Sequence, residues 1–243
     1  MGKLNYIFLI LAIFAEIIGT VGGFGSSVFF VPIGNFYFDF HSVLGLTAIF
    51  HLSSNVSKIV LFKKGLDKKL LLYIGLPSVI FVIIGGFLTK IIQTTILEII
   101  LAIFLLTLSL LFLLKNDLII LPNKKNAITG GVLSGFSAGL LGTGGAIRGL
   151  TMATFNLEKS VFIATSAFID FLIDLTRTFV YFKNGYIHKH DAIYLPFLIL
   201  IGIVGTFIGK KILTYISQNK FKRISLFLIL IIGIATLVKV ILE

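Results

Sequence analysis

The chain has 243 residues, of which 57% are hydrophobic and only 13% are charged, and its formal net charge is +11. A soluble globular domain is excluded, because it could not bury so much apolar surface. The basic residues stand at the ends of apolar runs, which excludes a nucleic-acid interface and is typical of charges that flank membrane helices. The sequence contains no cysteine, so disulfides, thiolate metal sites and cysteine nucleophiles are also excluded.

Apolar windows of about 20 residues are long enough to cross a bilayer as helices. We therefore predict an all-α polytopic membrane protein with about eight transmembrane segments, at 4–32, 42–62, 68–89, 94–114, 127–153, 159–182, 191–210 and 221–242. The connections are short, so we expect no appended soluble domain. The first segment contains Glu16 and has a counterpart deep in the chain, which favours a retained helix over a cleaved signal peptide.

The chain aligns with itself at a shift of 120 residues. The shift pairs Gly19 with Gly139, Gly22 with Gly142, Gly25 with Gly145, Phe62 with Phe182, Lys63 with Lys183 and Gly85 with Gly205. We predict one membrane domain, 1–243, built from repeat one (1–120) and repeat two (121–243), with four segments in each. If every segment crosses the membrane, the repeats are parallel; if the first and fifth are re-entrant hairpins, the second repeat is inverted.

Charges in the connections bear on orientation. With the N-terminus inside, the loops with Lys63 to Lys69, Lys115 to Lys125 and Lys183 to Lys189 are cytoplasmic, as the positive-inside rule requires. The last loop, from Lys210 to Arg223, then lies outside and disagrees. The sequence favours an N-terminus inside and leaves the orientation open.

Glycine clusters break the first segment of each repeat. Several glycines within one turn interrupt a helix, and non-helical backbone at membrane depth must be buried in protein or line a wet cavity. A half-helix that starts after each break, near Ser26 and Ala146, directs N–H groups and a positive dipole end at an anion. The predicted substrate-binding residues are Gly22, Gly25, Ser26, Ser27, Gly142, Thr143, Gly144, Gly145 and Arg148.

Close helix packing and nucleotide binding are two other interpretations of the glycines. Gly131, Gly135 and Gly139 form a small-xxx-small ridge, and we assign these three to close helix packing. A nucleotide-binding loop at Gly142 to Gly145 needs a preceding strand in a soluble α/β unit, which this composition does not provide.

Ionisable residues within apolar segments form a second group. Asp170, Asp174 and Arg177 are spaced to share one helix face, and His51, Asn55 and Lys58 have the same spacing. Intramembrane charges usually face a cavity or a partner. The predicted gating or coupling residues are Glu16, His51, Asn55, Lys58, Asp170, Asp174 and Arg177.

Structural roles compete with these assignments. Asp174 and Arg177 are also explained by an internal ion pair, and His51 by a polar helix contact. We expect Lys58 to extend to the membrane interface, and Glu16 to be protonated or paired across helices. With Arg148, the basic side chains of this region exceed the two aspartates by one charge, which suits a monovalent anion, and protonation of Glu16 would then couple anion and proton movement.

The sequence resembles the sulfite exporter TauE/SafE family over essentially its whole length. The resemblance rests on the two glycine breaks, on the run from Val21 through Ser27 to Val31-Pro32, on Ala164-Thr165-Ser166 and on Gly185-Tyr186-Ile187. It implies a seven-to-eight-helix transporter made by duplication that moves sulfite, sulfonates or related sulfur-containing or organic anions. Met152 stands where the second copy often carries proline, and Phe24 and Thr143 interrupt the glycine runs.

The expected function is therefore secondary transport of a small anion across the cell membrane by a multi-pass protein. An ion channel, or a transporter of an unrelated small solute, is the alternative. We expect no enzymatic activity, no metal and no cofactor, because the histidines have no metal-ligand spacing within a segment and His188-Lys189-His190-Asp191 is expected to be a solvated loop. The partners are the lipid bilayer and a small anionic substrate, with no nucleic acid, and assembly into a homo-oligomer is left open.

Overall fold

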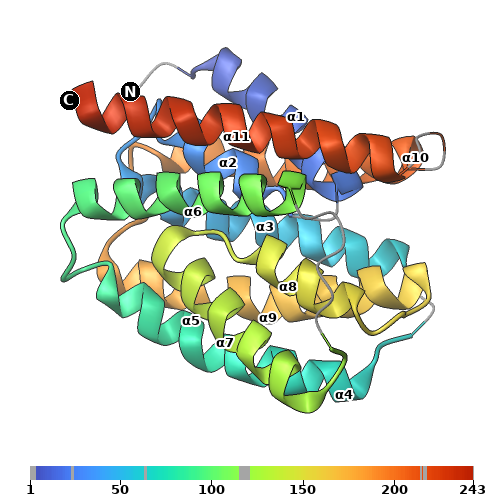
Figure 1. Ribbon diagram of the computed structural model, residues 1–243. Helices are drawn as coiled ribbons and strands as arrows, with labels where there is room; N and C mark the ends of the chain where they lie inside the picture. The colour runs from blue at the N-terminus through green and yellow to red at the C-terminus, as the bar shows by residue number, and fades with distance from the viewer. Residues whose placement is uncertain are drawn as a thin grey trace.

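The computed structural model describes residues 4–22, 25–62, 65–114, 121–213, 215 and 218–242, and over these residues the chain is helical without strands (Figure 1). Its elements are α1 (Tyr6–Gly22), α2 (Ser27–Gly34), α3 (Phe40–Leu61), α4 (Lys68–Leu70), η1 (Leu71–Gly75), α5 (Leu76–Leu88), α6 (Thr94–Leu114), α7 (Lys124–Leu141), α8 (Gly145–Ala153), α9 (Lys159–Asn184), η2 (Ala192–Tyr194), α10 (Leu195–Ile212) and α11 (Gln218–Leu242). The all-α prediction is confirmed for the described residues.

The two segments with glycine clusters are each two helices. The first divides into α1 and α2, where Gly25 has a φ of +81°, and the second into α7 and α8, where Gly142 has a φ of +73°. Glycine adopts this left-handed backbone at no steric cost, so Gly142 can end α7 as its C-cap and Gly25 can lead into α2. The predicted breaks, and the half-helices that follow them, are confirmed.

The chain reverses direction at both breaks. The rings of Phe8 and Phe30 lie 5.6 Å apart, so α2 runs back along α1. In the same way Ser134 Oγ donates a hydrogen bond to the carbonyl of Gly144 at 2.9 Å, and α8 returns beside α7. Each glycine segment is therefore a helical hairpin with one long and one short arm.

Helices α3 and α9 lie side by side at the centre and run antiparallel. Ser42 near the start of α3 bonds to Asp191 just beyond the end of α9, at 2.6 Å. Asn55, further along α3, bonds to Asp174 in the middle of α9, also at 2.6 Å. These two helices carry most of the ionisable residues that the sequence singled out.

Close helix contacts depend on glycine. An added Cβ on Gly131, Gly135 or Gly139 of α7 would collide with the α5 side of the interface, at the backbone of Ile74, Ser78 and Val82 respectively. The assignment of this ridge to packing is confirmed. On the opposite side of the bundle α10 approaches α1 through Gly205 and Gly209, which lie against Glu16 and Thr20.

Apolar length supports membrane insertion. Among the described residues, five helical stretches are long and apolar enough to cross a bilayer, and they cover α3, α4 to α5, α6, α10 with η2, and α11; α1 is a shorter apolar helix. Large apolar side chains such as Ile103 (53% exposed), Phe207 (63%) and Ile231 (60%) face outward. Such side chains suit a lipid environment.

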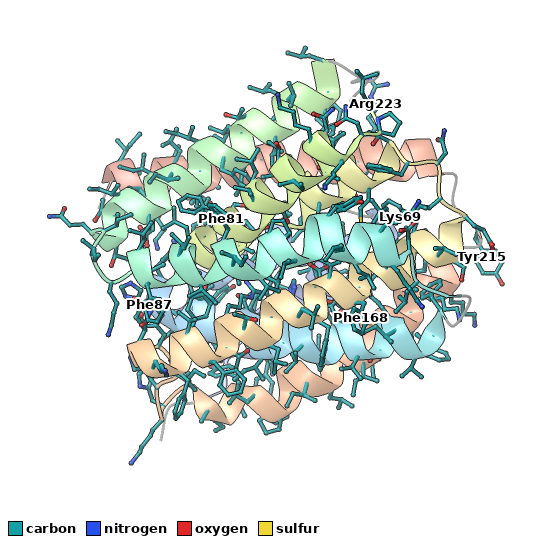
Figure 2. The ribbon with its side chains drawn as sticks, turned by 90° about the horizontal axis from the view of Figure 1, so that it is seen from below. Lys69, Phe81, Phe87, Phe168, Tyr215 and Arg223 are labelled. Carbon is teal, nitrogen blue, oxygen red and sulfur yellow. The ribbon has the colours of Figure 1, made fainter. Side chains whose placement is uncertain are left out.

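The two ends of the bundle differ in charge. One end, here called the basic end, carries the described residues Lys68, Lys69, Lys124, Lys125, Lys210, Lys211 and Arg223 at or near the termini of α4, α7, α10 and α11. Figure 2 shows Lys69, Tyr215 and Arg223 at this end and Phe87 at the other. The opposite end, here called the histidine end, carries Asp39, His41, His188, His190 and Asp191.

Asp39 caps α3 at the histidine end, where its carboxylate accepts from the backbone N–H of Ser42 at 3.0 Å. Partial burial raises the pKa of Asp39, but the hydrogen bonds from Ser42 and the nearby His188 and His41 outweigh it and hold the pKa below its ordinary value. The expected solvated loop at 188–191 needs correction, because Asp191 is only 3% exposed.

Candidate functional site

The two glycine breaks meet at the centre of the molecule. Gly25 and Gly145 are in van der Waals contact range, since a Cβ on Gly25 would lie 3.7 Å from the Gly145 Cα. Ser26, the N-cap residue of α2, makes no side-chain hydrogen bond to the first turn of its helix, and Gly144, the N-cap residue of α8, has no side chain that could do so. The N-termini of α2 and α8, with their positive dipole ends, thus approach one region.

A central cavity adjoins these N-termini. Its volume is about 20 Å³ for the centre of a water-sized sphere, and about 350 Å³ when all the space between side chains and the opening to solvent are counted. Most of the residues that line it were predicted from the sequence, namely Gly25, Ser26, Ser27, His51, Asn55, Lys58, Gly142, Gly144, Gly145, Asp170, Asp174 and Arg177. The other two, Ala138 and Ile173, were not predicted as site residues. The structure therefore brings the glycine breaks and the intramembrane charges to one place.

Arg177 joins α9 to the break between α7 and α8. Its Nη2 lies 2.8 Å from Asp174 Oδ1, and its Nη1 donates to the carbonyl of Gly142 at 2.7 Å. The internal ion pair is present, and Asn55 Nδ2 supports it with a 2.6 Å bond to the other Asp174 oxygen. The Nε of Arg177 is buried and has no hydrogen-bond partner among the described residues, so one guanidinium donor is unused.

Arg148, in the first turn of α8, forms a bidentate pair with Asp170 of α9. Its Nε donates to Ser166 at 3.0 Å, and the side chain is almost completely buried. Arg148, Ser166 and Asp170 line a second cavity, of about 490 Å³ when its opening to solvent is included, which shares Gly25, Lys58 and Asp170 with the central one.

This second cavity leads toward the basic end. Phe62 and Leu213, which follow the last residues of α3 and α10, are among its lining residues. A polar region at the bundle centre therefore connects with a more apolar vestibule on the side where the lysines gather.

Glu16 lies behind the central cavity and is completely buried. Its carboxylate accepts hydrogen bonds from Ser26 and Ser54 at 2.5 Å each and from Thr20 and Thr206 at 2.9 Å each. So many donors stabilise a buried carboxylate.

Lys58 differs from the expectation. Instead of extending to the interface, its Nζ lies 3.1 Å from Glu16 Oε1, and its side chain is 13% exposed. The reason is that the hydroxyl-rich pocket around Glu16 offers a desolvated carboxylate within one lysine length, and pairing offsets burial of both charges. The expectation that Glu16 would be paired across helices is confirmed.

His51 connects this cluster to the cavity. Its Nε2 lies 3.1 Å from Ser26 Oγ, the same hydroxyl that bonds to Glu16. His51 therefore makes the polar helix contact that was expected, and its ring also lines the cavity.

Two predicted site residues that the structure describes, Glu16 and Thr143, line neither cavity. Thr143 is buried with an Oγ1 that has no partner among the described residues. Gly22 is the last residue of α1, and its surroundings lie outside what the structure describes. Sequence reasoning missed Ser166 and Thr206, which bond to Arg148 and Glu16. A hydroxyl residue in an apolar segment does not by itself indicate a functional site. Ser166 and Thr206 are recognised only by the charged side chains that they contact in the structure.

The sulfite exporter TauE/SafE family matches residues 8–236, nearly the whole chain, and the protein therefore belongs to this family of membrane transporters of sulfite or related anions. No curated protein and no solved structure gave a significant match.

Proposed function

We propose that this member of the sulfite exporter TauE/SafE family is a secondary transporter that moves a small sulfur-containing or organic anion, such as sulfite or a sulfonate, across the cell membrane. The observation that carries the proposal is the convergence of two half-helix N-termini and the Arg177 guanidinium on one central cavity. Helix N-termini and guanidinium groups are both favourable for anions. Fixed-charge donors around a small space suit a compact anion better than a bulky one.

The charge balance of the site supports a proposal of proton coupling. Lys58, Arg148 and Arg177 each lie against one carboxylate, so with every group ionised the region has no net charge. A proton on Glu16 removes one negative charge and leaves Lys58 free to attract an anion. We therefore propose that an anion and a proton occupy the site together.

The repeats are proposed to be inverted in the membrane. Since α2 and α8 turn back beside α1 and α7, each repeat crosses an odd number of times, which is consistent with the antiparallel pair α3 and α9. Inverted repeats with broken helices at a central site are a common transporter architecture. In this arrangement the last loop lies at the basic end with Lys68, Lys69, Lys124 and Lys125, and it no longer conflicts with the positive-inside rule, whereas Lys90, Lys183 and Lys189 lie at the histidine end.

The test is uptake of radiolabelled sulfite and sulfate into proteoliposomes, with and without a pH gradient. Arg148→Gln removes a charge beside the cavity, whereas Arg223→Gln removes an arginine charge at the exposed basic end and is the matched control. Loss of a charged hydrogen-bond donor is worth about 1.5–3 kcal/mol, so uptake by Arg148→Gln should fall by about 10- to 100-fold. Arg223→Gln should transport like the intact chain.

Folding of both variants is checked by monodispersity and thermal unfolding in detergent. If the folded Arg148→Gln protein transports at the full rate, the site assignment is wrong. If the intact chain takes up neither sulfite nor sulfate, the same assay with sulfonates and organic acids decides whether any anion is a substrate.

A further inference from the structure

We propose that His188, His190 and Asp191 form a binding site for a divalent transition-metal ion of the zinc type at the histidine end. The site lies outside the helices that line the central cavity, and the transport proposal does not use it. Its metal-binding atoms, one from each residue, all lie within 4.8 Å of one another.

The distances between these atoms fit a metal ion. His190 Nε2 lies 3.3 Å from Asp191 Oδ1, and His188 Nδ1 lies 3.6 Å from Asp191 Oδ2. Ligand atoms placed about 2.0–2.2 Å from a tetrahedral zinc ion are separated by roughly 3.3–3.5 Å. Each histidine thus lies near the separation from Asp191 that two ligands of one zinc ion require, although the two contacts use different oxygens of the carboxylate.

The backbone holds the three ligands together. Gly185 ends α9 in a left-handed conformation, and the Asp191 N–H then donates to the His188 carbonyl at 3.1 Å. This tight turn puts His188 and Asp191 on the same side, and the rings of His188 and His190 are stacked with their centres 5.3 Å apart. A preformed arrangement lowers the ordering cost of binding.

A hydroxyl from α3 positions one of the ligands. Ser42 Oγ donates to Asp191 Oδ2 at 2.6 Å, and such outer-sphere hydrogen bonds orient metal ligands. Ser42 Oγ also lies 2.7 Å from His188 Nδ1, and this contact gives way when that nitrogen binds the ion. An ion at this site would therefore connect the start of α3, in repeat one, with the α9–α10 connection, in repeat two.

Charge and access favour a cation. Asp191 is buried, and the Asp39 carboxylate lies 4.0 Å from His188, so two carboxylates stand beside the histidine rings. The exposed Lys189, between the two histidines in sequence, opposes this attraction. The side chains of His188 and His190 are 38% and 69% exposed, which leaves a route for the ion and room for a water ligand.

The test is titration of ZnCl2 into detergent-purified protein that has no polyhistidine tag, followed by calorimetry and by the shift in thermal unfolding. We expect one zinc ion per chain, a higher unfolding temperature and no response to MgCl2, because magnesium prefers oxygen ligands. His190→Ala should abolish both signals, and its exposed position makes misfolding a small risk. Ser42→Ala should weaken zinc binding by about 10- to 100-fold.

His41→Ala is the matched control, because His41 lies at the same end but its ring stacks on Tyr186 and is not one of the three ligands. It should bind zinc with unchanged affinity. Equal zinc binding by the intact chain and His190→Ala, or no binding by the folded intact chain, would overturn the proposal.

Discussion

Single charged residues at the centre of this protein are paired, and the pairs join different parts of the chain. Lys58 reaches from α3 to α1, and Arg148 from α8 to α9. Arg177 pairs within its own helix but also holds the break at Gly142. Removing one partner of a buried pair strands the other charge, whereas removing both is often tolerated. Comparing the unfolding of single and double variants therefore measures the role of a pair in stability, and uptake assays measure its role in transport separately.

Glu16→Gln should lower the stability of the protein, because Lys58 is then buried without its carboxylate. We expect a cost at or below the lower end of the roughly 3–5 kcal/mol typical of broken buried pairs, since the Lys58 side chain keeps 13% exposure. The double variant Glu16→Gln/Lys58→Met should recover most of the loss. Thermal unfolding of the three proteins in detergent measures this.

The same Glu16→Gln variant tests coupling. If Glu16 carries the proton, sulfite uptake by the variant should no longer respond to a pH gradient, even where some uptake persists. Uptake with the same rate and the same pH response as the intact chain would rule out the coupling role, whatever the variant does to stability.

At the scale of helices, the decisive feature is close approach through glycine. The α5–α7 contact and the α1–α10 contact each depend on glycines whose missing Cβ would collide with the neighbouring helix. Small residues let membrane helices pack by van der Waals contact where no hydrophobic effect drives them together. These contacts hold the hairpins that carry the half-helices.

Gly135→Ala should destabilise the protein, because its Cβ would collide with the backbone of Ser78, which cannot rotate away. Overpacking typically costs about 1–3 kcal/mol, and we expect the upper part of that range. Gly75→Ala is the matched control, since its Cβ would lie 3.4 Å from Ile169, an ordinary contact. Its unfolding temperature should stay close to that of the intact chain, and a similar loss in both variants would contradict the packing explanation.

At the scale of the whole molecule, the direction of each helix decides which charges share a membrane side. The reversal at each break brings the basic residues near the termini of α4, α7, α10 and α11 to one end. The positive-inside rule predicts that this end is cytoplasmic. The start of α1 and the end of α11 lie at the histidine end, so both are predicted to face the outside.

Because the chain has no cysteine, single-cysteine labelling tests this orientation cleanly. Lys69→Cys lies at the basic end and Lys90→Cys beyond α5 at the other, and both positions are exposed. A membrane-impermeant maleimide added to intact cells should label Lys90→Cys and leave Lys69→Cys unlabelled until the cells are lysed. The opposite pattern would place the termini inside, as the charge of the early loops alone had favoured.

The sequence by itself determined the membrane class, the helical segments, the two breaks and most of the cavity residues. These features are local: apolar length, glycine clusters and helical spacing are all written in consecutive residues, and the 120-residue repeat matched the two breaks to each other. Even the packing role of Gly131, Gly135 and Gly139 followed from their spacing.

Only the tertiary structure decided the direction of the chain after each break and the partner of each charge. Whether a glycine turn continues or reverses a helix depends on what the next segment packs against, which no local pattern encodes. The pairing of Lys58 with Glu16 joins residues 42 positions apart on α3 and α1, and Ser42 meets His188 and Asp191 from more than 140 positions away. These contacts form because α3 packs against α1 and runs antiparallel to α9.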